Sequence, residues 1–146
     1  MRGTSNISAK ERLCWLQLIR SENVGQISFF QLLHRFKSAE ETLRQIPDLA
    51  KKGGAKRPIR IFSQSAAKSE LAQLEEFGGR LIAMPDPDYP ALLREIHDPP
   101  PVISILGHSQ LLNRSCLGIV GSRNASANAI RLTRSFAEKV GARDIT

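Results

Sequence analysis

The residues best suited to hold a ligand are Gly121, Ser122, Arg123 and Asn124, which separate an apolar stretch at residues 116–120 from an amphipathic one. The change of period predicts a strand, a loop and a helix. Backbone N–H groups and the dipole at the start of such a helix favour an anion, and the Arg123 guanidinium matches phosphate oxygens. We therefore predict a phosphate-binding loop. The alternative is that Gly121 only permits a tight turn and Arg123 is a solvated surface residue, because one glycine is weaker than a dinucleotide fingerprint.

Other reactive side chains give little sign of chemistry. His34, His97 and His108 are isolated and lack metal-ligand spacing. Cys14 and Cys116 lie in apolar patterns, so we expect two small buried side chains and no disulfide framework. No nucleophile beside a base and no paired acid and base is visible. The sequence therefore favours binding over catalysis and calls for neither a metal nor a cofactor.

Composition and charge narrow the class of protein. The chain has 146 residues, 41% hydrophobic and 24% charged, which is typical of a folded globular protein. It contains no apolar run of membrane-spanning length and no signal-peptide pattern, so we expect a cytoplasmic location. The net charge is +7; residues 1–62 hold twelve Lys or Arg against five Asp or Glu, whereas residues 63–146 hold nine of each. This asymmetry favours a nucleic-acid partner, and a surface that serves only solubility is the alternative.

Two helices joined by a tight turn are predicted near the N-terminus. Ser8 and Glu11 have the form of a capping box, and apolar residues recur at helical spacing on both sides of a polar break at residues 22–26. Val24 and Gly25 lie in this break, where glycine can adopt a positive φ. Such a unit looks like a helix-hairpin-helix, whose turn offers N–H groups to a phosphate. An ordinary helical hairpin is the alternative, since the match is partial.

A basic segment follows the next predicted helix. Ser38 and Glu41 form a second capping box that predicts a helix to Ile46, and Pro47 suits the first position of another turn of helix. Five basic residues then surround a diglycine without any acid: Lys51, Lys52, Lys56, Arg57 and Arg60. We interpret them as a mobile linker able to follow a phosphate backbone, with a hydrated connector as the alternative.

Helices and strands alternate in the rest of the chain. A helix is predicted from Ser63 to Phe77, with Gly78 as its C-terminal cap. The predicted strands are residues 80–84, 102–106 and 116–120; a helix begins at Ala127, and residues 144–146 begin another strand. This order indicates a parallel α/β sheet with its ligand beyond the carboxyl ends of the strands. We expect a helical domain over residues 1–62 and an incomplete α/β domain over residues 63–146.

Several motifs in this order and spacing resemble the DNA-processing protein A family (DprA), also called Smf. In chain order they are Val24-Gly25, Leu32-Leu33-His34-Arg35-Phe36, Gly78-Gly79-Arg80, Asp88-Tyr89-Pro90-Ala91-Leu92-Leu93, Asp98-Pro99-Pro100-Pro101 and Ile119-Val120-Gly121-Ser122-Arg123. Each motif alone is weak evidence. Together they are specific and run across nearly the whole chain.

The resemblance implies a sterile-alpha-motif-like (SAM-like) helical domain followed by an extended Rossmann-like domain. Members of that family bind and protect incoming single-stranded DNA in natural transformation, form homodimers and help to load the RecA recombinase. By the family's pattern, Gly121, Ser122 and Arg123 belong to the pocket that holds the DNA backbone. Family members continue beyond the position of Thr146 with further strands and a glycine-rich segment, so we expect this chain to be the N-terminal portion of such a protein.

The leading hypothesis is thus a non-catalytic binder of single-stranded DNA, with Tyr89 as one possible platform for base stacking. A Rossmann-like nucleotide-binding enzyme, similar to a phosphoribohydrolase, is a second hypothesis, because the same loop can hold a nucleotide phosphate. A helical fragment that binds a protein partner through an apolar face is a third.

Overall fold

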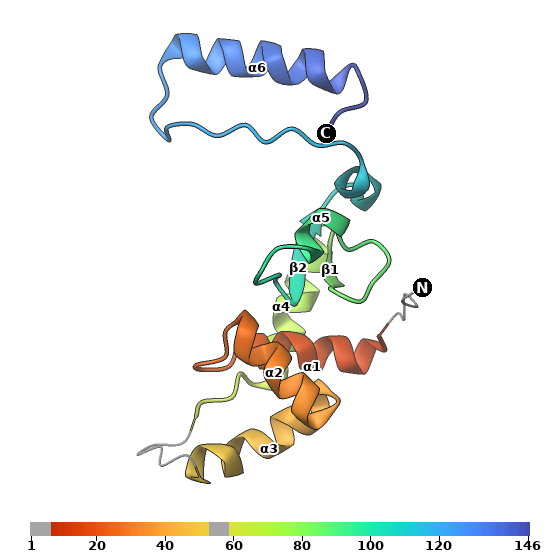
Figure 1. Ribbon diagram of the computed structural model, residues 1–146, viewed down its shortest axis with the longest axis vertical. Helices are drawn as coiled ribbons and strands as arrows, with labels where there is room; N and C mark the ends of the chain where they lie inside the picture. The colour runs from red at the N-terminus through yellow and green to blue at the C-terminus, as the bar shows by residue number, and fades with distance from the viewer. Residues whose placement is uncertain (1–6, 53–58) are drawn as a thin grey trace. The chain divides into compact units, whose positions relative to one another are not determined.

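The computed structural model describes residues 7–52 and 59–146, and it divides into two compact units, Met1–Gly107 and His108–Thr146 (Figure 1). The helical N-terminal part and the α/β character of the remainder agree with the predicted fold class. The predicted domain boundary after Phe62 lies inside the first unit. No helix among the described residues is long and apolar enough to cross a membrane.

Helices α1 (Ala9–Ile19), α2 (Gln26–Phe36) and α3 (Ala39–Lys52) form the N-terminal part of the first unit. The predicted caps are confirmed, because Ser8 Oγ accepts from the Glu11 N–H and Ser38 Oγ accepts from the Glu41 N–H, both at 3.1 Å. The Glu11 carboxylate does not complete the first capping box by reaching back. It accepts from the Ala39 N–H at 2.6 Å and from Trp15 Nε1 at 3.1 Å, and so ties α1 to the start of α3.

The turn between α1 and α2 differs from the prediction in its backbone. Asn23 adopts the positive φ, at 61°, whereas Gly25 has φ −94° and ψ 177°, which is extended backbone open to any residue. Asparagine tolerates the left-handed region because its short side chain can hydrogen-bond locally. Glycine is therefore not needed at position 25 for its conformational freedom.

Helix α3 also runs further than the sequence suggests. Pro47 lies inside this single helix and does not begin a second one. Proline removes one N–H donor from a helix, but α3 continues through this position to Lys52. The helix consequently includes the first two residues of the predicted linker, Lys51 and Lys52.

Aromatic side chains form the centre of the first unit. Trp15 meets Phe29 edge to face with ring centroids 5.0 Å apart, and Phe29 meets Phe30 in the same way at 5.3 Å. Trp15 and Phe29 belong to a buried cluster that comprises Cys14, Trp15, Leu18, Phe29, Ala39, Ile46 and Ala83. Because Ala83 comes from a strand far along the chain, the helical part and the sheet share one core.

The sheet of the first unit has two strands, β1 (Gly79–Ala83) and β2 (Val102–Leu106), which follow helix α4 (Gln64–Glu76). Both strands are confirmed, but they pair antiparallel and the predicted parallel arrangement is wrong for this pair. The connection carries only the one-turn helix α5 (Ala91–Arg94), and its end returns beside β1, where the Met84 N–H donates to the Pro101 carbonyl at 2.8 Å. A parallel pair needs a crossover, usually a full helix.

A double glycine joins α4 to β1. Gly78 has φ +74°, which confirms it as the predicted cap. Gly79 is required for a different reason: a Cβ on it would lie 2.5 Å from Leu74 Cδ1 and 2.9 Å from the Ile105 carbonyl oxygen. The strand therefore passes closer to α4 and β2 than any side chain would allow.

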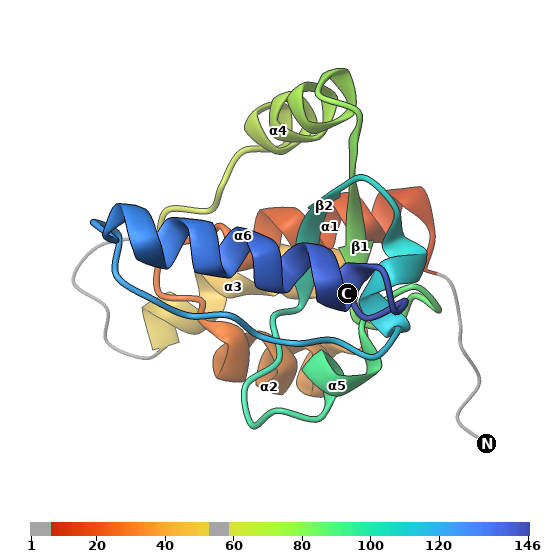
Figure 2. The same cartoon turned by 90° about the horizontal axis from the view of Figure 1, so that it is seen from above.

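The second unit contains the 3₁₀ helix η1 (Ser109–Asn113) and helix α6 (Ala127–Gly141). An extended segment precedes α6 and runs alongside it in both views (Figures 1 and 2). Residues 116–120 are not in a strand, which corrects the prediction. This segment makes two backbone hydrogen bonds with the last residue: the Thr146 N–H donates to the Ser115 carbonyl at 2.9 Å, and the Leu117 N–H donates to the Thr146 carbonyl at 2.8 Å. These two bonds on either side of Cys116 follow the pattern of a parallel ladder.

Candidate nucleic-acid interface

The predicted loop, residues 121–124, lies directly before α6 and is exposed. Ser126 caps the helix, since its Oγ accepts from the Ala129 N–H at 3.3 Å. The sequence reading missed this cap, although serine immediately before a helical pattern is its usual signal. The loop thus lies near the N-terminal end of a fifteen-residue helix, where the helix dipole favours an anion.

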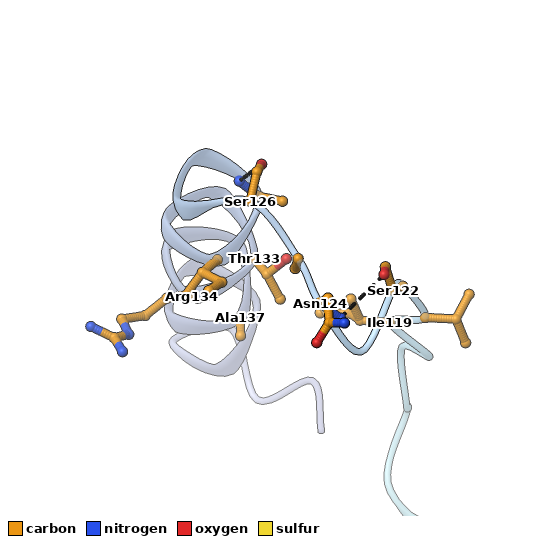
Figure 3. Close-up of a pocket in the computed structure, with 12 residues that line it drawn as sticks. Ile119, Ser122, Asn124, Ser126, Thr133, Arg134 and Ala137 are labelled. Carbon is orange, nitrogen blue, oxygen red and sulfur yellow. Dashed lines mark hydrogen bonds between the residues drawn. The ribbon is translucent and has the colours of Figure 1, made fainter.

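A hollow of about 650 Å³ separates this loop from α6 (Figure 3). Gly121, Ser122 and Asn124 line one side, and the Asn124 N–H donates to Ser122 Oγ at 3.2 Å, which fixes the loop's shape. Thr133 points from the helix toward the loop, whereas the Arg134 side chain extends away from it. The structure therefore brings three of the four predicted loop residues to one cavity.

Arg123, the fourth loop residue, does not line that hollow. It is exposed, and its guanidinium forms no hydrogen bond or ion pair with any residue that the structure describes. Gly121 has open space where a Cβ would stand. The loop thus offers a cation that no described residue neutralises, beside an unobstructed stretch of backbone.

Only part of the predicted basic linker is visible. Lys56 and Arg57 lie outside the described residues, as do the side chains of Lys51 and Lys52. Arg60 is exposed, but both polar groups of its backbone are hydrogen-bonded to Glu22. Its N–H donates to Glu22 Oε2 and its carbonyl accepts from the Glu22 N–H, each at 3.1 Å. The far end of the predicted mobile linker is therefore anchored beside the turn between α1 and α2.

In the turn between α1 and α2, the backbone N–H groups of Val24 and Gly25, which were predicted to face a phosphate, are hydrogen-bonded within the protein. The Val24 N–H donates to the Ser21 carbonyl at 3.3 Å, and the Gly25 N–H donates to Ser28 Oγ at 2.9 Å. Together with Arg20 and other residues, the turn lines a hollow of about 320 Å³. Arg20 is already paired with Glu70, its Nη2 lying 2.7 Å from Oε1. Phosphate binding at this turn stays a prediction.

Tyr89 is not available for base stacking. Its side chain is 1% exposed, and its hydroxyl donates to the Pro100 carbonyl at 2.7 Å. Burial raises the pKa of Tyr89 to about 12. Arg94 lies over its ring, 5.6 Å from the centroid, and donates to the Met84 and Asp86 carbonyls. The segment around Tyr89 is therefore structural, and the stacking hypothesis for this residue is wrong.

The two cysteines differ in environment. Cys14 is buried as predicted, and this burial raises the pKa of its thiol. Cys116 is exposed, contrary to the prediction, because the segment that contains it is not covered by a sheet or helix among the described residues. No group of three or more His, Cys, Asp or Glu residues suited to a metal occurs in the described part of the chain.

Charge is distributed unevenly within residues 63–146. Residues 63–107 hold three Lys or Arg against seven Asp or Glu, a net −4, and residues 108–146 hold six against two, a net +4. The balance of zero over residues 63–146 thus hides a basic second unit. In that unit Arg114 pairs with Asp144 at 3.5 Å, and five basic side chains form no ion pair with any described residue: Arg123, Arg131, Arg134, Lys139 and Arg143.

Comparison with known proteins gives consistent matches along the chain. The family model described as "DprA-like N-terminal HHH domain" matches residues 9–72, and the one described as "DNA recombination-mediator protein A" matches residues 80–146. The protein named Smf from Synechocystis sp. is 29% identical over an alignment of 140 residues, and the match covers 88% of this chain and 35% of that relative. The chain therefore spans about a third of the length of this relative.

Proposed function

Because the chain belongs to the DprA/Smf family of DNA-processing proteins, as its N-terminal portion, we propose that it binds single-stranded DNA through residues 121–124. The observation that carries this proposal is the Arg123 guanidinium, which lies shortly before the start of α6 and has no ion pair or hydrogen bond with any described residue. Arg123 contacts a phosphate directly, while the backbone around Gly121 and Ser122 approaches the strand closely. No base readout is needed for such binding.

The electrostatics of the second unit support a polyanionic ligand. Its net charge is +4, and its unpaired cations can replace the counterions of a phosphate backbone. A mononucleotide offers far fewer phosphate contacts than an oligonucleotide does. We therefore expect single-stranded DNA, and not a free nucleotide, to raise the apparent stability of the protein in a thermal-shift comparison.

The finer parts of the role are proposed by analogy with the family. We propose that the protein protects incoming single strands during natural transformation in the cytoplasm, helps to load RecA, and acts without catalysis as part of a homodimer. RecA loading is tested by adding the protein to single strands coated with single-strand-binding protein and following the onset of RecA ATP hydrolysis. An unchanged onset removes this part of the proposal and leaves DNA binding standing.

The direct test is the affinity for fluorescent oligo-dT, measured by anisotropy at several salt concentrations. Arg123→Ala should weaken binding about tenfold or more, because a charged hydrogen bond contributes about 1.5–3 kcal/mol. Lys68→Ala is the matched control: it removes one exposed charge, on α4 of the first unit, and should leave the affinity unchanged. Equal affinities for the wild type and Arg123→Ala, or an affinity that does not depend on salt, would contradict the phosphate contact.

A further inference from the structure

The function proposed above gives no role to two arginines on the first turns of α6. Arg131 and Arg134 are both exposed and lie three residues apart, so they are neighbours on one face of the helix. Arg134 also lines the hollow behind the loop, from which its side chain extends outward (Figure 3). The loop, the rim of the hollow and the polar face of α6 are thus continuous.

The charge of these two arginines is not neutralised within the second unit. Arg131 donates to Asn128 Oδ1, a neutral acceptor, and Arg134 forms no ion pair with a described residue. The acidic residues of the second unit are Glu138 and Asp144, and Asp144 pairs with Arg114. Glu138 is four residues beyond Arg134, on the same face of the helix. The positive surface therefore covers the first two turns of α6 and ends at Glu138.

We infer that a single strand held at residues 121–124 continues over this surface, with Arg134 and Arg131 contacting further phosphates. The inference rests on the proposed function and extends its site from the loop to the polar face of α6. Loss of each phosphate contact with a single strand lowers the slope of log affinity against log salt by about 0.7. Glu138 repels the strand where the positive surface ends.

The experiment measures oligo-dT affinity of the full chain against salt for Arg131→Gln/Arg134→Gln, with Lys68→Gln as the control. We expect the double variant to lose about 1.4 from the slope and the control to lose nothing. Glu138→Gln should change affinity in the opposite direction and strengthen binding. This opposite sign separates a phosphate contact from a general loss of folding, which could only weaken binding.

Arg123→Gln separates this inference from the proposed function. If Arg123→Gln weakens binding while the double variant and Glu138→Gln both match the wild type, the extension along α6 is wrong and the loop site stands. If the wild type does not bind oligo-dT, both are overturned. Reduced slope in the double variant together with tighter binding by Glu138→Gln supports the extension.

Discussion

In residues 7–107, apolar side chains from distant parts of the sequence meet in two buried clusters, whereas residues 108–146, all of them described, contain no buried apolar side chain. Leu16, Leu18 and Phe29 are at most 1% exposed. In the second unit, Leu132 is 70% exposed and Val120 is 97% exposed, although both belong to apolar patterns as regular as those of the first unit. Hydrophobic pattern therefore indicates which face can be buried and does not supply the surface that buries it.

The same two units treat their charges differently. In the first, five of the ten described basic side chains have acidic partners: Lys10 with Glu40, Arg12 with Asp86, Arg20 with Glu70, Arg44 with Glu41 and Arg80 with Asp88. In the second, five basic side chains form no ion pair with a described residue. Ion pairs thus involve half of the described basic side chains of the first unit, but one of the six in the second, Arg114. The difference is the reason why the proposed anion site is sought in the second unit.

Hydrogen exchange should show the largest contrast between the units. Helix α1 packs in a core, so we expect its amides to exchange mainly through global unfolding, whereas α6 has no buried residue and a helix of this length is marginal alone. We expect protection in α1 to exceed that in α6 by at least about a thousandfold. Mass spectrometry of peptides from both helices gives the ratio. Comparable protection would mean that the second unit has a stabilising environment of its own.

Asp86→Ala should have the next largest effect, a loss of stability in the first unit alone. Asp86 is buried; its carboxylate oxygens accept from two nitrogen atoms of Arg12, and Oδ2 also accepts from the Ala83 N–H at 2.8 Å. Breaking such a pair costs about 3 kcal/mol. Urea unfolding followed by the fluorescence of Trp15, the single tryptophan of the chain, measures the loss.

Asp88→Ala is the control for Asp86→Ala. Asp88 pairs with Arg80, but the two side chains are 44% and 52% exposed, so this pair contributes less than about 1 kcal/mol. Similar losses of stability in the two variants would contradict the buried role assigned to Asp86. Unchanged oligo-dT affinity in Asp88→Ala would separate the charge pairs of the first unit from the free cations of the second.

Local features of the fold could be predicted from the sequence because they depend on a few neighbouring residues. Ser8, Ser38 and Ser63 cap helices as predicted, Gly78 ends α4 with a positive φ, and β2 has the predicted limits. Each of these depends on one side chain or one short pattern. They fix where elements begin and end.

Pairing and burial could not be predicted in the same way, since they depend on distant residues. The antiparallel pairing of β1 with β2 follows from a connection that turns back, and the burial of Tyr89 follows from the carbonyl of Pro100. Residues 116–120 have the apolar pattern of a central strand, but among the described residues their backbone hydrogen-bonds only where Thr146 lies beside them. For the loop at residues 121–124, the phosphate site stays a prediction from the sequence, and the structure adds that Arg123 has no ion pair with any described residue.

Two glycine substitutions should each change a different property: Gly79→Ala the stability, and Gly121→Ala the affinity for DNA. Gly79→Ala places a Cβ against Leu74 and the Ile105 carbonyl oxygen, and such overpacking costs about 1–3 kcal/mol. Gly121→Ala meets nothing within 4 Å, so stability should be unchanged, but the methyl group obstructs close approach of a DNA strand. Unfolding by urea and oligo-dT affinity, measured on both variants, should therefore change separately. Loss of stability in Gly121→Ala would show that the loop is packed after all.

Tyr89→Phe should have a small effect on stability, about 1 kcal/mol at neutral pH, because it removes one hydrogen bond and keeps the buried ring. The pH dependence is more informative. The pKa of Tyr89 is about 12 in the fold against 10.0 for an ordinary tyrosine, so its contribution to stability is fully present below pH 10 and is lost as the pH rises toward 12. Tyr89→Phe should lack this alkaline loss. Tyr89 is the single tyrosine, so tyrosinate absorbance reports it alone, and a midpoint near pH 10 in the folded wild type would contradict its burial.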